Sequence, residues 1–317
     1  MHYHHLPVMP SEVIDYLNCR PGRAYADCTL GGAGHAIRIC EKIGPGGTLI
    51  GIDQDLDAVE NARKKLKRCS AHVHIVHDNF VNLPDILVRL DIPAVDGMLL
   101  DLGLSLHQIE ASGRGFSFNR DEPLDMRMNA ARGTTAGEIV NHESEANLAR
   151  IFKEYGEEPR GRSIARKIAA VRKKETICSS RQLARIVIEA LPGKARYGRK
   201  LHPATRVFMA LRIAVNRELE RLREFLAHAA DYLNPGGRLC VLSFHSLEDR
   251  IVKQRFVALA RGCTCPPAFP HCVCGLRPVA RIVTRKVVRP SQAEVDANPM
   301  ARSTRLRVLE KLTPESA

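Results

Sequence analysis

Four short apolar segments near the start of the sequence, separated by stretches of helical periodicity, constrain the fold more than any other feature. The segments are residues 24–28, 48–53, 73–76 and 95–101. Between the second and third segments, apolar residues recur at helical spacing, namely Leu56, Val59, Ala62 and Leu66. Apolar strands that alternate with helices are typical of a parallel sheet covered on both faces. The sequence therefore predicts an α/β fold.

This alternation stops after Asp101 and resumes about a hundred residues later. The intervening segment is rich in Arg, Glu, Gly and Ala and shows helical patterns without an obvious apolar strand. One long amphipathic helix is then expected from Phe208 to Ala229, before a turn signal at 234–237. Later strands are expected at 238–244, 281–288 and 306–309. We predict an α/β domain of residues 1–105 and 205–317, interrupted by a helical domain of residues 106–204.

The composition favours a folded protein with a polyanionic partner. Hydrophobic residues make up 44% of the chain, and the formal net charge is +13, with 48 Lys and Arg against 35 Asp and Glu. Such an excess indicates nucleic acid, because each neutralised phosphate releases counterions; a merely soluble basic surface is the alternative. The sequence has no run of eighteen apolar residues and no secretory signal pattern, so we expect a cytoplasmic protein with no membrane partner.

A glycine-rich loop follows the first predicted strand, which ends at Asp27. The loop reads Gly31-Gly32-Ala33-Gly34-His35 and leads into a helix. In an open α/β sheet, such a loop lets the backbone approach a ligand closely. The dinucleotide fingerprint G-x-G-x-x-G is incomplete, because Ile37 stands where its third glycine would be. This departure disfavours a nicotinamide-dependent oxidoreductase.

Acidic residues close the other predicted strands in the same way. Asp53 ends the second strand, Asp78 follows the third together with Asn79 and Phe80, and Asp101 ends the fourth. A carboxylate at such a position can accept hydrogen bonds from ribose hydroxyls, and an aromatic ring suits adenine. A solvated carboxylate is the alternative for each residue alone. Together they indicate an adenosine ligand without a pyrophosphate, which suggests S-adenosylmethionine.

Distinctive strings occur in order along almost the whole chain. They are 5–8, 31–35, 51–55, 101–105 with Gln108, 114–118, 123–128, 155–158, 202–206, 210–212, 243–250 and 301–303. In these strings the sequence resembles the bacterial small-subunit ribosomal RNA methyltransferases that modify N4 of a cytidine, the MraW (RsmH) family.

The resemblance implies a class I, Rossmann-like methyltransferase with a mostly parallel seven-stranded sheet and an inserted all-helical substrate-recognition domain. It implies S-adenosylmethionine as cofactor and 16S ribosomal RNA in the small ribosomal subunit, near the decoding centre, as substrate. The cofactor contacts it implies are Ala33, Gly34, His35, Asp53, Phe80, Asp101 and Gln108. A homodimer is a further expectation. A non-catalytic RNA-binding ribosome assembly factor is the alternative function.

The predicted catalytic residues are Asp101, Ser105 and His245. Asp101, together with Ser105, is expected to accept the hydrogens of the cytosine amine, unless Asp101 only orients the cofactor. His245 lies in the string 243–250 and is expected to position the target base; a helix cap by Ser246 is the alternative. A hydrolase triad in this string is disfavoured, because no serine there lies in a G-x-S-x-G elbow.

Basic residues are dense in the predicted helical insertion and suit contacts with phosphates, although glutamates are interspersed and a solvated helix face is the alternative. They are Arg160, Arg162, Arg166, Lys167, Arg172, Lys173, Lys174, Lys194, Arg196, Arg199 and Lys200.

Ten cysteines fall into two groups. Six are scattered singly and are expected to be reduced buried thiols: Cys19, Cys28, Cys40, Cys69, Cys178 and Cys240. Four lie in one short stretch: Cys263, Cys265, Cys272 and Cys274. Four thiolates can complete a tetrahedral zinc site, but a single residue between paired ligands is shorter than the usual spacing. The sequence therefore favours no metal here, with free thiols or an oxidation-sensitive loop, and a zinc site is the alternative, for which His271 is a fifth candidate ligand.

Overall fold

The structure is a computed structural model that describes residues 7–193, 202–263, 265–266 and 268–313. The chain forms two compact units. The sheet unit comprises Met1–Gly103 and Leu219–Ala317, and the helical unit comprises Leu104–Glu218. Among the described residues, none of the helices has the length and apolar character that a membrane crossing requires.

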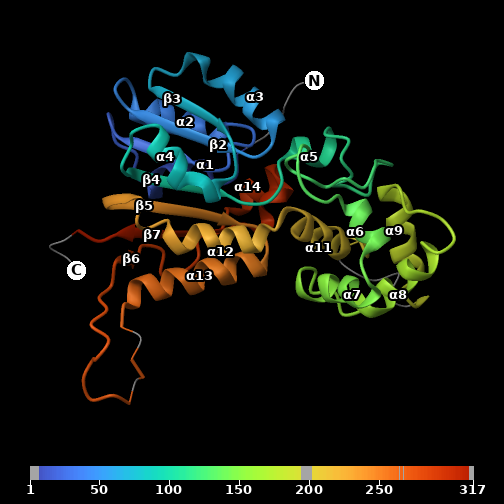
Figure 1. The fold of residues 1–317 in the computed structure, drawn as a ribbon. Coiled ribbons are helices and arrows are strands. Elements are labelled where there is room, and N and C mark those ends of the chain that lie inside the picture. The colour runs from blue at the N-terminus through green and yellow to red at the C-terminus, as the bar shows by residue number, and fades with distance from the viewer. Residues whose placement is uncertain (1–6, 194–201, 264, 267, 314–317) are drawn as a thin grey trace. The chain divides into compact units, whose positions relative to one another are not determined.

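The sheet unit is built on seven strands in the order β3-β2-β1-β4-β5-β7-β6 (Figure 1). The strands are β1 (Ala24–Asp27), β2 (Thr48–Asp53), β3 (His72–His77), β4 (Val95–Asp101), β5 (Leu233–Ser243), β6 (Ala280–Ile282) and β7 (Arg305–Lys311). Strands β1 to β5 pair in parallel, and β7 runs antiparallel to both of its neighbours. The predicted α/β class with a mostly parallel seven-stranded sheet is confirmed.

Helices connect these strands and supply their apolar cover. They are α1 (Pro10–Leu17), α2 (Gly34–Ile43), α3 (Leu56–Lys65), η1 (Leu66–Arg68), η2 (Phe80–Asn82), α4 (Leu83–Arg89), α12 (Glu218–His228), α13 (Ser246–Arg261), α14 (Gln292–Ala297) and η3 (Pro299–Ser303). Leu17 of α1 and Ile39 of α2 are almost fully buried in one core cluster with Leu49 and Leu99 of the sheet. Each such side chain contributes about 2 kcal/mol by leaving water. In Figure 1, α12 and α13 run side by side, and the Arg255 Nε–H donates to the Leu226 carbonyl (2.9 Å) between them.

The helical unit packs its helices around a separate apolar core. Its helices are α5 (Leu106–Glu110), α6 (Ala136–His142), α7 (Glu145–Glu154), α8 (Gly161–Val171), α9 (Ser180–Glu189) and α11 (Thr205–Asn216). Phe152, Ile164, Leu183 and Leu211 are almost fully buried in this core. Thr135, Ser144 and Ser179 begin α6, α7 and α9 by accepting a hydrogen bond from a backbone N–H of the first turn, as N-cap residues do.

The prediction of one long helix from Phe208 to Ala229 was wrong. The helix ends at Asn216, because Arg217 adopts a left-handed backbone conformation with φ of 51°. The Asn216 amide nitrogen donates to the carbonyls of Arg212 (2.9 Å) and Met126 (2.8 Å). As a result α11 belongs to the helical unit and α12 begins at the start of the sheet unit's second segment. The unit boundary therefore falls after Glu218, whereas the sequence-based domain boundary was placed after residue 204.

Strands β5, β6 and β7 also differ in length from their predicted ranges. Strand β5 includes residues 234–237, which were predicted as a turn before the strand; a register shift in its pairing with β4 accommodates them. Strand β6 ends at Ile282, and Val288 forms only an isolated bridge to Leu306. Strand β7 extends beyond the predicted 306–309 at both ends.

The prediction that the scattered cysteines are all reduced thiols was wrong for one pair. Cys40 of α2 and Cys69, which follows η1, form a disulfide with a Cα–Cα distance of 6.0 Å. Cys28 and Cys240 are buried free thiols, as expected, whereas Cys178 is exposed. Burial raises the pKa of the Cys28 thiol, which keeps it protonated and unreactive.

Candidate active site

The carboxyl ends of the parallel strands bring three acidic residues to one edge of the sheet. The register pairs Asp27 of β1 with Gly51 of β2, while Asp53 and Asp101 are the last residues of β2 and β4. Because parallel strands all end at the same edge, these carboxylates face the region in which open α/β sheets bind their ligands. The edge is therefore the candidate active site.

Asp53 holds the loop between β1 and α2 in place. Its Oδ2 accepts a hydrogen bond from the Gly31 N–H (2.8 Å), and its Oδ1 accepts one from the Asp55 N–H (2.9 Å). The Lys65 ammonium group donates to the Gly32 carbonyl (2.9 Å) from α3. Desolvation by burial raises the pKa of Asp53 to about 6. A carboxylate has lone pairs beyond these two bonds, so Asp53 can also accept from a ligand hydroxyl.

Ala33 and Gly34 give the loop its shape at the start of α2. Ala33 is the N-cap residue and has φ of 63°, in the left-handed region that favours glycine. A Cβ on Gly34 would lie 2.9 Å from side-chain atoms of Pro7, so only glycine fits there without a shift. The shape of the loop at these two predicted cofactor contacts therefore depends on a left-handed backbone at Ala33 and on the absence of a side chain at Gly34.

Asp27, His35 and Asp101 form a buried polar cluster at this edge. Asp27 is 1% exposed and His35 is 4% exposed. His35 Nε2 lies 3.5 Å from Asp101 Oδ2, and the Asp101 N–H donates to Thr29 Oγ1 (2.6 Å). Asp27 Oδ2, Asp101 Oδ1 and both ring nitrogens of His35 have no hydrogen-bond partner in the structure. Buried polar atoms are almost always bonded, so the gathering of four such atoms at the sheet edge makes this cluster a candidate ligand site.

Burial raises the pKa of Asp27 to about 7. The electrostatic interaction with His35 and a hydrogen bond from the Thr29 N–H (3.2 Å) lower the pKa of Asp27 in part. The negative charge of Asp101 raises it further. Asp27 is therefore close to half ionised at neutral pH. A cationic group placed beside it would favour the ionised form.

Phe80 begins the short helix η2 after β3, on a turn capped by Asn79, whose Oδ1 accepts from the Val81 N–H (3.1 Å). Its ring meets Phe225 edge to face, with centroids 5.4 Å apart. Asp78, by contrast, bonds within the protein, since its Oδ1 accepts from the Asn82 amide (2.6 Å). Of the residues after β3, Phe80 therefore suits a ligand and Asp78 holds the turn.

His245 lies between β5 and α13 and is the N-cap residue of that helix. Its Nε2 lies 3.1 Å from Oε1 of the buried Glu248, whose Oε2 accepts from the backbone N–H of Phe244 (2.9 Å). The Ser243 hydroxyl donates to the Arg305 carbonyl (3.3 Å), and Asp249 pairs with Arg307 (2.7 Å). The Asp249 N–H donates to the His245 carbonyl (3.2 Å), as in a first helical turn, while the side chains of Ser243 and Asp249 bond to Arg305 and Arg307 and not to the His245 ring. The string 243–250 therefore forms a helix start and not a hydrolase triad.

Ser105 and Gln108 belong to the helical unit and bond to each other. The Ser105 hydroxyl accepts from the Gln108 N–H (3.2 Å), and the Gln108 Oε1 accepts from the Ser105 N–H (3.0 Å). This is the capping box of α5. The pattern Ser-x-x-Gln is a recognisable signature of a helix start, and it could have been read from the sequence.

The basic residues predicted to bind phosphate divide by their contacts. Lys167 pairs with Glu189 (3.0 Å), and the Arg172 guanidinium donates to the Val140 carbonyl (2.8 Å). Arg166 lies 3.8 Å from a carboxylate oxygen of Glu145. Four others are exposed on the helical unit: Arg160, Arg162, Lys173 and Lys174. The remaining four, Lys194, Arg196, Arg199 and Lys200, lie outside the described residues.

Asp27 was predicted as one of the strand-end carboxylates that together indicate an adenosine ligand, but it was not among the cofactor contacts that the resemblance implied, although its place at the end of β1 matches that of Asp53 and Asp101. The signal was its position, since it closes an apolar strand immediately before the glycine-rich loop. Gln54 was also missed; its side-chain oxygen accepts from the Asn79 amide (2.9 Å) and from Arg221 (2.7 Å). No sequence pattern pointed to that contact.

A mostly parallel sheet of this order, with carboxylates at the carboxyl ends of its strands, belongs to the Rossmann-like α/β class. The model of the MraW methylase family matches residues 2–312. The chain therefore belongs to the MraW methylase family, and the family predicted from the sequence is confirmed.

Individual relatives match over nearly their full length. A Desulfosudis oleivorans protein named ribosomal RNA small subunit methyltransferase H is 54% identical over 98% of this chain and 100% of that protein. Proteins of the same name from Desulforapulum autotrophicum (55% identical, 97% of this chain and 99% of the relative) and Brevibacillus brevis (47% identical, 98% of each) are also similar. A family of methylases does not favour the alternative of a non-catalytic assembly factor.

Proposed function

We propose that the chain transfers the methyl group of S-adenosylmethionine to N4 of a cytidine in small-subunit (16S) ribosomal RNA, near the decoding centre. Membership in the MraW methylase family and relatives named as small-subunit ribosomal RNA methyltransferases support the reaction class and the RNA. The structural observation that carries the proposal is the buried cluster of Asp27, His35 and Asp101, with its unbonded polar atoms at the carboxyl edge of the sheet.

The residues at this edge fit S-adenosylmethionine. The cofactor supplies a methyl group on a positively charged sulfur, which a nucleophile can take. Asp27 and Asp101 offer negative charge for the cationic sulfur and amino group, and His35 offers a ring nitrogen. Asp53 is suited to accept hydrogen bonds from ribose hydroxyls, and Phe80 to contact the adenine. Ala33 and Gly34 let the backbone approach, and the predicted contact from Gln108 remains part of the proposal.

Methylation of a cytosine amine requires an acceptor for one of its hydrogens, because the nitrogen gains a bond to carbon as the methyl leaves sulfur. Asp101 is our candidate acceptor, since its Oδ1 is buried and has no hydrogen-bond partner. A positioned acceptor of this kind contributes about 10²–10⁴ in rate. Ser105 and His245, which both begin helices, are proposed to position the target base.

The helical unit is proposed to recognise the RNA. Its exposed cations Arg160, Arg162, Lys173 and Lys174, together with the net charge of +13, support contacts with phosphates. RNA affinity should then fall steeply as salt rises. A cytoplasmic location follows from the substrate, and the expected homodimer stays a prediction that light scattering on the purified protein would test.

Methyl transfer with labelled S-adenosylmethionine tests the proposal. Small subunits from cells that lack this protein are the substrate, and the labelled nucleoside is identified by nuclease digestion and mass spectrometry. We expect label at N4 of one cytidine near the decoding centre. Label at another atom would refute the proposed chemistry, and no label in subunits or free ribosomal RNA would refute the activity.

A further inference from the structure

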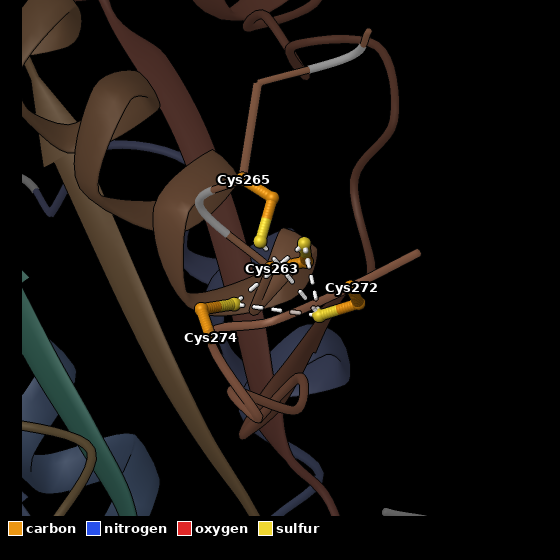
Figure 2. Close-up of side chains that lie close together, drawn as sticks. All are labelled: Cys263, Cys265, Cys272 and Cys274. Carbon is orange, nitrogen blue, oxygen red and sulfur yellow. Dashed lines mark hydrogen bonds between the residues drawn. The ribbon is translucent and has the colours of Figure 1, made fainter. Parts of the chain in front are cut away.

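The four clustered cysteines lie in the loop between α13 and β6 and turn their sulfur atoms toward one another (Figure 2). Cys272 is central: its Sγ lies 3.5 Å from Cys263, 3.5 Å from Cys274 and 4.0 Å from Cys265. Cys274 Sγ lies 3.7 Å from Cys263 Sγ. All four sulfur atoms are within 4.8 Å of one another.

These separations match the edges of a tetrahedron around a metal ion. A Zn–S bond of about 2.3 Å places two thiolate ligands of a tetrahedral zinc site about 3.8 Å apart. Disulfide sulfurs are about 2.05 Å apart, so none of the distances corresponds to a covalent pair. Only one residue separates the cysteines of each pair, which is shorter than the usual spacing of zinc ligands. The four sulfur atoms nevertheless lie close together.

Little else in the loop would hold the sulfurs together. The described residues from 262 to 279 form no helix or strand, and loops of this length without structure of their own are uncommon. Phe269, Val273 and Leu276 are each more than half exposed, so they form no apolar core there. A bound metal would supply the missing cross-link.

The two ends of the loop are closed independently of the cysteines. The Val279 N–H donates to the Leu259 carbonyl (3.1 Å), which joins the loop's exit to α13. Gly262 has φ of 66°, and a Cβ there would lie 2.3 Å from the backbone of Arg277. The two ends of the loop are therefore held next to each other at Gly262 and Val279. The two cysteine pairs face each other in the part of the loop that follows.

One backbone contact also suits a metal-bound thiolate. Val273 is the residue between Cys272 and Cys274 in the sequence, and its N–H donates to Cys265 Sγ (3.3 Å). Hydrogen bonds to ligand atoms orient them and are a regular part of metal sites. His271, the fifth candidate ligand, is not in the cluster of ligand atoms.

We propose that Cys263, Cys265, Cys272 and Cys274 bind one Zn²⁺ ion in a structural site. Four thiolates favour zinc among abundant divalent ions and fill its tetrahedral coordination, leaving no position for a substrate. The site has no part in the proposed methyl transfer and cross-links the loop between α13 and β6.

Elemental analysis of the untagged protein, purified in the presence of a thiol reductant and without chelators, tests the proposal. We expect about one zinc ion per chain in the wild type and in Cys178→Ser, which removes an exposed free cysteine elsewhere. Cys272→Ser should lose most of the zinc. Iron at one equivalent or more, or a folded Cys272→Ser protein that keeps its zinc, would overturn the proposal.

A second measurement needs no variant. The metal is removed from the wild-type protein under reducing conditions, and Co²⁺ is added in its place. A tetrahedral tetrathiolate site gives intense cobalt absorption bands, which one equivalent of Zn²⁺ should abolish. If the metal-free protein has its four cysteines reduced, gives no such bands and takes up no zinc, the proposed zinc site is wrong. This holds whatever the behaviour of Cys272→Ser.

Discussion

The two compact units differ in how completely their buried polar side chains are hydrogen-bonded. Among the described residues, every buried side-chain nitrogen or oxygen without a hydrogen-bond partner belongs to the sheet unit. In the helical unit, the buried side chains of Ser105, Gln108 and Asn216 all form hydrogen bonds within the protein. An unbonded buried polar atom costs free energy, so each one calls for an explanation, and a bound ligand is our explanation for those of Asp27, His35 and Asp101. The described part of the helical unit thus pairs its buried polar side chains internally, whereas the sheet unit leaves several without a partner, including those of Asp27, His35 and Asp101.

The variant Asp101→Asn tests this difference between the units with the largest expected effect, because it changes one of the unbonded side chains of the sheet unit. An amide cannot take up the amine proton, so we expect kcat to fall by about 10²-fold or more, with a smaller loss of affinity for S-adenosylhomocysteine, whose amino group loses one negatively charged neighbour. Single-turnover methyl transfer and calorimetry measure the two quantities. Asp15→Asn, at an exposed acid of α1, is the matched control. A near-normal kcat would leave Asp101 only the role of orienting the cofactor.

In the helical unit, Asn216→Ala should affect folding. It removes two donated bonds and the bond that Asn216 Oδ1 accepts from the Met128 N–H (2.8 Å). Because buried backbone groups lose their partners, we expect the free energy of unfolding to fall by about 3 kcal/mol. Urea unfolding measures the loss, with the exposed Asn119→Ala as control. A loss below about 1 kcal/mol would show that these bonds do not determine the end of α11.

The dependence of cofactor binding on pH tests Asp27. Its pKa of about 7 lies above the ordinary carboxyl value, so the protonated form stabilises the empty fold at low pH, and this contribution is lost as the pH rises through 7. A cationic ligand needs the ionised form, so affinity should rise about tenfold from pH 6 to pH 8. His35, Asp53 and Asp101 face the same group. In Asp27→Asn the dependence on pH should disappear. An unchanged dependence in this variant would show that Asp27 is not the group whose ionisation controls binding.

Gln108→Ala should give the smallest change. It removes one half of the capping box of α5, which should cost about 1 kcal/mol in the free energy of unfolding. If Gln108 also contacts the cofactor, as proposed, affinity for S-adenosylhomocysteine should fall about fivefold. Calorimetry and urea unfolding of one preparation separate the effects. Lost stability with unchanged affinity would remove Gln108 from the site.

The sheet and the position of most candidate site residues at its edge were predictable from sequence, because parallel strands end at one edge. Asp53 and Asp101 could be placed there from the apolar segments that they close. The left-handed Arg217 was not predictable, since positive φ at a residue other than glycine depends on tertiary contacts such as those of Asn216. The Cys40–Cys69 disulfide was missed for a similar reason: pairing depends on the distance between elements, which spacing along the chain does not give.

Titration of S-adenosylhomocysteine into the purified protein by calorimetry tests the role of the sheet edge most directly. We predict one binding site per chain for the wild type, and an affinity about 30-fold lower for Asp53→Ala, which removes the carboxylate suited to the ribose hydroxyls. No detectable binding by the folded wild type, or equal binding by the two proteins, would contradict a cofactor site built on the strand-end carboxylates.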